Sequence, residues 1–166
     1  MAKSTRTSSQ TPSGASRDLR ALLHVPQHDL QAQLSTRLER LGFPALRAAQ
    51  IQILSAITPD GVRLSDLVSE VGLPKQTVGD LIADLEIMRM VERFPDPDHG
   101  VIKRVRLGPK GRVWAAEVKR VGAATEARWA TRMGSKKMKS LRSLLEELAA
   151  TVEDRSANGA KHKQRG

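Results

Sequence analysis

The chain has 166 residues, and its 28 Lys and Arg against 18 Asp and Glu give a formal net charge of +10. The length fits one domain with tails, and zero cysteine excludes a disulfide framework, a thiol nucleophile and a cysteine-ligated zinc site. Aromatic residues make up 2% of the chain, which argues against reading single strands by stacking bases on aromatic rings. The positive charge favours a polyanionic partner.

No apolar run approaches the roughly 18 residues of a membrane span, and the first residues lack the apolar segment of a secretory signal. We therefore expect a cytoplasmic protein with no membrane partner. Residues 1–16 and 156–166 contain too little apolar surface to offset the entropy of ordering them, so both are predicted to be disordered basic tails. Residues 17–155 form the predicted domain.

The first half of this domain is predicted to be helical. An apolar set at residues 19–23 precedes Pro26, which is expected to separate it from a helix ending at Gly42. The apolar residues of that helix recur at helical spacing and are Leu30, Leu34, Leu38 and Leu41. A second helix is expected from about Pro44 to Ile57, followed by a turn at residues 58–61.

Two short helices follow, separated by a tight turn. Residues 64–71 predict a helix that ends at Gly72, and Pro74 suits the first turn of the next helix. One apolar face of that next helix is formed by Val78, Leu81, Ile82, Leu85 and Met88. This arrangement indicates a helix-turn-helix, whose second helix we call the recognition helix.

The spacing of apolar residues then changes from the helical period to the two-residue period of strands. Val91 to Phe94 and Val101 to Leu107 predict a hairpin in which Lys103 and Val105 point to one face and Arg104 and Arg106 to the other. Helices are expected from about residue 109 and from about Ser135. The order predicts a mostly α protein with a small β-hairpin wing, that is, a winged helix-turn-helix with N- and C-terminal helices outside it.

Short motifs in this order resemble the MarR family of transcriptional regulators over roughly residues 27–153. They are Leu64-Ser-Asp-Leu, Val71-Gly-Leu-Pro, Thr77-Val78, Asp84-Leu85-Glu86, Val91-Glu-Arg, Asp96-Pro97, Lys103 through Leu107 and Gly111-Arg112. The resemblance implies a winged-helix core at about residues 44–108 and dimerisation helices at about 27–42 and 109–153. At the wing tip, His99 and Gly100 replace the acid–arginine pair that is usual in the family.

The resemblance also implies a homodimer on double-stranded DNA. The outer helices would build the subunit contact, with candidate residues Leu34, Leu38, Leu141, Leu144, Leu145 and Leu148. The recognition helix would enter the major groove of a roughly palindromic operator, and the wing would reach toward the minor groove. Many family members release DNA when a small molecule binds between the dimerisation and reading regions, so an effector is considered as a partner.

The candidate DNA-contacting residues lie in two groups. Lys75, Gln76 and Thr77 begin the recognition helix, where Lys can pair with guanine and Gln with adenine. Asp80, one turn further on, can accept from a cytosine amino group, but it is expected rather to repel phosphate or to pair with a nearby cation. The wing candidates are His99, Lys103, Arg104 and Arg106. These candidate residues either contact DNA or form an ordinary solvated face. The predicted winged-helix fold favours DNA contact.

The positive charge is unevenly distributed. Residues 64–107 hold six Lys and Arg against eight Asp and Glu, a net charge of −2, whereas residues 1–63 carry +4 and residues 108–166 carry +8. Phosphate neutralisation dominates non-specific DNA affinity, so an acidic reading region weakens the inference from total charge alone. The basic cluster at the start of the last helix either approaches DNA or is a solvated helix end.

Other chemistry is not indicated. His24 and His28 have a spacing that can ligate a metal on a helix, but the intervening Pro26 and the lack of a zincin glutamate favour two exposed histidines. Trp114 and Trp129 fit a packing stripe as well as a ligand pocket. No phosphate-binding glycine loop or nucleophile elbow occurs. We predict no cofactor, no metal and no enzymatic activity.

The sequence predicts a homodimeric, sequence-specific DNA-binding transcriptional regulator. The alternative is a winged-helix module that binds another protein without reading bases. The net negative charge of the reading region and the missing wing-tip arginine favour this alternative.

Overall fold

The computed structural model describes residues 18–97, 100 and 103–163, with side chains described as far as Val152. The predicted tail at residues 1–16 and the wing-tip candidate His99 lie outside this part of the chain. The elements are α1 (Leu19–Arg40), α2 (Ala48–Ala56), β1 (Val62–Arg63), α3 (Leu64–Val71), α4 (Lys75–Ile87), β2 (Val91–Pro95), β3 (Lys103–Leu107), α5 (Pro109–Met133) and α6 (Ser135–Lys163). The predicted fold class is therefore confirmed.

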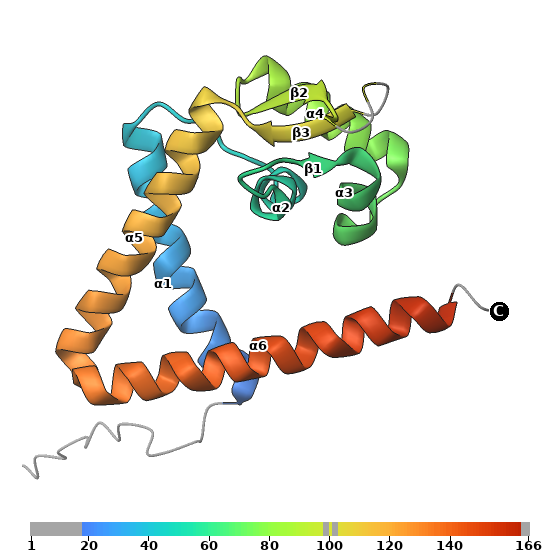
Figure 1. Ribbon diagram of the computed structural model, residues 1–166. Coiled ribbons are helices and arrows are strands. Elements are labelled where there is room, and N and C mark those ends of the chain that lie inside the picture. Colours follow the sequence, from blue (N-terminus) through green and yellow to red (C-terminus); the bar gives the residue numbers. More distant parts are fainter. Residues whose placement is uncertain (1–17, 98–99, 101–102, 164–166) are drawn as a thin grey trace, which may run out of the picture.

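The molecule has two regions, which Figure 1 shows. Helices α2 to α4 and the sheet form the winged helix at one end of α5, and α1, α5 and α6 form the long outer helices. Within the described residues, no helix is both long and apolar enough to cross a membrane.

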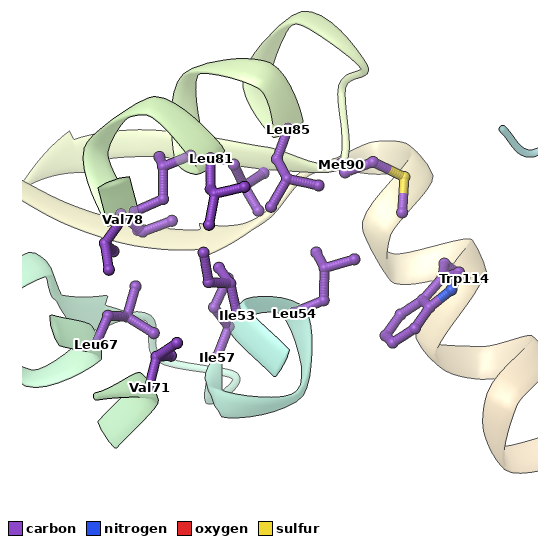
Figure 2. Packing of buried hydrophobic residues seen from close by; sticks show 13 residues of the cluster. Ile53, Leu54, Ile57, Leu67, Val71, Val78, Leu81, Leu85, Met90 and Trp114 are labelled. Atoms are coloured by element: carbon purple, nitrogen blue, oxygen red, sulfur yellow. The ribbon is translucent and has the colours of Figure 1, made fainter. Parts of the chain in front are cut away.

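The hydrophobic core lies in the winged helix. Figure 2 shows Val78, Leu81 and Leu85 of α4 pointing toward side chains of α2 and α3. Ile53 from α2 and Leu67 from α3 are fully buried in the same cluster. Burying one aliphatic side chain of this size contributes about 1.5–3 kcal/mol, so this cluster fixes which face of α4 is turned inward.

The sheet has three antiparallel strands in the order β1-β3-β2. The predicted hairpin corresponds to β2 and β3, which pair from Val91 with Leu107 to Pro95 with Lys103. The short β1 was not predicted. Because β1 has two residues, it offers no alternation of apolar and polar side chains that could reveal a strand.

The prediction that Pro26 breaks the first helix is wrong, because α1 runs through it. A proline inside a helix costs about 3 kcal/mol, and α1 nevertheless continues through Pro26 and packs against α5. The Asp18 carboxylate caps the helix by accepting from the Ala21 N–H at 2.7 Å. Nearer the C-terminal end, α1 contacts α5 through Arg37, whose Nε donates to Glu117 at 2.8 Å.

Two helix ends also differ from expectation. Helix α2 begins at Ala48 instead of Pro44, and its N-cap Arg47 donates its backbone N–H to the Gln50 side chain at 3.0 Å. Helix α6 continues to Lys163, through most of the segment that was predicted as the disordered C-terminal tail.

Candidate nucleic-acid interface

The N-terminal end of the recognition helix α4 is exposed. The preceding helix α3 ends at Gly72, whose left-handed backbone (φ 68°) turns the chain sharply before the Pro74 N-cap. Burial of the opposite face of α4 in the core then turns Lys75, Gln76 and Thr77 to the surface. The structure thus brings the three predicted base-reading residues together on the surface.

Two of the acids in this region are balanced by arginines that sequence analysis did not assign to them. Arg47, before α2, pairs with Asp84 of α4. Arg93 of β2 pairs with Glu86 at 3.3 Å and donates to the Gly79 carbonyl oxygen. No local pattern signals these pairs, because the partners come from different elements.

Other acids of the winged helix lack an ion-pair partner among the described residues. Among the described residues of the winged helix, Asp66, Glu70 and Asp80 are exposed and take part in no ion pair. The predicted pairing of Asp80 with a nearby cation is therefore absent from the described residues, and repulsion of phosphate and acceptance from a cytosine amino group stay as predictions. A duplex seated on α4 would have to tolerate or use this carboxylate.

The wing splits its basic residues between two faces, as predicted. Val105 of β3 is buried, and Lys103, the first residue of the same strand, is exposed. On the outer face, the Arg106 guanidinium lies 5.0 Å from the centre of the Phe94 ring and pairs with Glu92 at 3.1 Å. Arg106 is therefore compensated by an ion pair, whereas Lys103 has no ion-pair partner among the described residues.

The Arg104 guanidinium is held by contacts within the winged helix. Its Nη2 donates to the Gly61 carbonyl oxygen at 2.9 Å, and its Nη1 lies 3.9 Å from Asp96. Asp96 is fully buried and also accepts from Arg63 Nε at 2.8 Å. This network ties β1 to the base of the wing, so the guanidinium predicted to contact DNA is turned toward the protein body. Sequence reasoning missed Arg63 because it lies 33 residues before Asp96.

A groove of about 970 Å³ separates the winged helix from α5. Its walls are the end of α2 and the following loop, the first half of α5, and the Glu92–Arg106 pair of the wing. Trp114 lines it and is almost fully buried. The groove is lined by Arg106, Arg112 and Lys119 against one acid, so it combines apolar surface with a positive balance.

The other tryptophan, Trp129, lies outside the groove lining and joins two outer helices. Its indole N–H donates to Asp29 at 2.9 Å, and Arg128 pairs with the same carboxylate. The Trp129 hydrogen bond is the largest cause that holds the pKa of Asp29 below its ordinary value. Between α1 and α5, the hydrogen bond from Arg37 is likewise the largest cause that lowers the pKa of Glu117 to about 2.

The predicted dimerisation leucines have different environments. Leu34 and Leu141 are half-buried, and Leu38 packs partly against the winged-helix core. On α6, by contrast, Leu144, Leu145 and Leu148 are exposed by 63%, 42% and 47%. The α6 leucines thus form an apolar row that lacks a partner in the described part of this single chain.

The comparisons with known proteins agree with this geometry. A model of the DprA winged helix domain matches residues 42–96. No curated protein matches the sequence. Among solved structures, MarR has a TM-score of 0.60 and 20% identity, and the match covers 82% of this chain and 98% of MarR.

Two further structures are similar. The transcriptional regulator Tm0710 from Thermotoga maritima has a TM-score of 0.58 and 22% identity, and the match covers 83% of this chain and 96% of Tm0710. A mutant of S. aureus MepR bound to an oligodeoxyribonucleotide has a TM-score of 0.55 and 16% identity, covering 82% of this chain and 99% of that one. The chain therefore has a winged-helix fold. In particular, its fold is that of the MarR-like regulators.

Proposed function

We propose that this protein is a homodimeric, sequence-specific double-stranded DNA-binding transcriptional regulator. The observation that carries the proposal is the exposed start of α4, where Lys75, Gln76 and Thr77 stand together on a helix whose other face is locked into the core. The oligodeoxyribonucleotide bound to the similar MepR mutant supports the same use of the fold.

In the proposed complex, α4 lies in the major groove. Lys75 can donate to guanine, and the Gln76 amide can form a bidentate pair with adenine. Lys103 in the wing neutralises a backbone phosphate, which positions the protein without reading sequence. Arg104 supports this arrangement from inside by holding the base of the wing to Gly61 and Asp96.

The homodimer is proposed from the apolar row on α6. A second copy would cover Leu144, Leu145 and Leu148, which otherwise leave large apolar side chains in water. Two-fold symmetry would place two α4 helices about one helical turn of DNA apart, which predicts a roughly palindromic operator.

Regulation by a small molecule is proposed for the groove. A ligand with an apolar body and a negative charge would fit Trp114 and the cations Arg106, Arg112 and Lys119. Because the groove touches both α5 and the Glu92–Arg106 pair of the wing, such a ligand can bias the wing relative to the outer helices.

The test is a gel shift against genomic fragments at low salt, followed by variants on the best fragment. Gln76→Ala should weaken binding by about 1–3 kcal/mol and relax specificity at one base pair. Lys75→Ala should also weaken binding, whereas Arg40→Ala, an exposed cation of α1, should leave it unchanged. Failure of the wild type to bind any fragment, or equal binding by Gln76→Ala, contradicts the proposal.

A second function is a protein-interaction module. It is favoured by the uncompensated acids Asp66, Glu70 and Asp80 on the surface of the winged helix. Pull-downs with and without nuclease separate the two functions. Partners that survive nuclease, together with negligible duplex affinity, would favour the interaction module.

A further inference from the structure

A concentration of positive charge lies where α5 meets α6. Residues 128–142, here called the α5–α6 corner, contain six Lys and Arg and no Asp or Glu. Figure 1 shows this corner at the end of α5 opposite to the wing. These cations therefore lie at the other end of α5 from the exposed start of α4, here called the reading face.

Four of these cations are uncompensated. At the two ends of the corner, Arg128 pairs with Asp29 and Arg142 with acids on α5 and α6. The remaining ones are exposed and form no ion pair with any described residue: Arg132, Lys136, Lys137 and Lys139. Covering them with an apolar interface would require desolvating four charges, so the corner stays open when the leucines of α6 are covered.

The corner and the reading face act independently. Helix α5 has 25 residues, so at 1.5 Å per residue it separates them by about 37 Å. The Debye length at 0.1 M salt is about 10 Å, so the corner contributes little to the field at α4.

We propose that the α5–α6 corner is a second, sequence-independent binding surface for the phosphate backbone of duplex DNA. A molecule held on one DNA segment through α4 would capture another segment through this corner. The flexible lysine ammonium groups suit phosphates in varied positions, and the positive end of the α6 dipole adds to the attraction. The capture of two segments rests on the proposed function, whereas the phosphate contact at the corner does not.

The first experiment measures fluorescence anisotropy of a random-sequence 40-bp duplex as a function of salt. Replacing Lys136 and Lys139 with glutamine should lower the slope of log K against log[salt] by about 2, because two phosphate contacts are lost. The matched control, Arg20→Gln/Arg40→Gln, removes the same charge from exposed positions of α1 and should keep the wild-type slope. An unchanged slope in the corner variant, or no binding of this duplex by the folded wild type, overturns the proposal.

A reading-face variant separates this proposal from the proposed function. Gln76→Ala/Thr77→Ala changes no charge and should bind the random duplex with the wild-type slope while losing any preference for a genomic fragment. Loss of random-duplex binding in this variant would place the phosphate contact at α4 and refute the corner. If the wild type prefers no fragment but the corner variant loses slope, the corner stands and the proposed function fails.

A capture assay then tests the two-segment consequence. A genomic fragment selected by gel shift is fixed on beads and loaded with protein, and the fluorescent random duplex is added. The wild type should retain the duplex. The Lys136→Gln/Lys139→Gln variant should lose most of this retention while staying bound to the beads. Equal retention by both proteins contradicts capture through the corner.

Discussion

Replacing Asp96 with alanine should destabilise the winged helix and loosen the wing. The side chain is fully buried and accepts from Arg63 at 2.8 Å, with Arg104 at 3.9 Å. Removing one partner of a buried ion pair costs about 3–5 kcal/mol. Since the side chains of Arg63 and Arg104 keep 38% and 23% of their exposure, water can solvate them in part. We therefore expect a loss of about 2–3 kcal/mol.

Urea unfolding at fixed protein concentration measures this loss. With a slope of about 1–3 kcal/mol per molar urea, the midpoint should fall by about 0.7–3 M. Asp66→Ala is the matched control, because it removes the same charge from an exposed position of the winged helix, and it should change stability by at most about 0.5 kcal/mol. Equal midpoints for the Asp96 and Asp66 variants would refute the reasoning.

Two further predictions concern α5. A Cβ on Gly111 would collide with the Met90 carbonyl oxygen, so Gly111→Ala should destabilise the protein by about 1–3 kcal/mol in thermal unfolding. Gly122→Ala on the same helix meets nothing within 4 Å and should stabilise by about 0.5–1 kcal/mol; a loss at both sites would contradict the packing argument. The hydrogen bond from Arg37 is the largest cause that lowers the pKa of Glu117 to about 2, so its stabilisation is complete above pH 4.5 and is lost as the pH falls toward 2. The stability difference between wild type and Glu117→Gln should shrink over that range, and a constant difference would rule the linkage out.

Much of the local structure follows from short-range patterns. The helical spacing of Val78, Leu81 and Leu85 already specifies which face of α4 is buried, and that in turn exposes Lys75 and Gln76. The alternation in β3 likewise places Arg104 and Arg106 opposite Val105. Such features could be predicted because the residues that decide them are neighbours in the chain.

The environment of each candidate residue could not be predicted in this way. Whether Arg104 faces DNA or the protein depends on Asp96 and on the Gly61 carbonyl oxygen, which lies 43 residues away. The compensation of Asp84 by Arg47 depends on how α2 packs against α4. Electrostatic contacts of this kind have no periodic signature.

The sequence by itself determined the winged-helix order and the buried face of α4, because burial imposes a period on the side chains of each element. It also determined how charge is distributed along the chain. The tertiary structure alone decided that α1 continues through Pro26, that Arg104 braces the wing, and that the basic α5–α6 corner lies far from α4. These outcomes depend on contacts and distances between elements far apart in the chain, which local propensity does not encode.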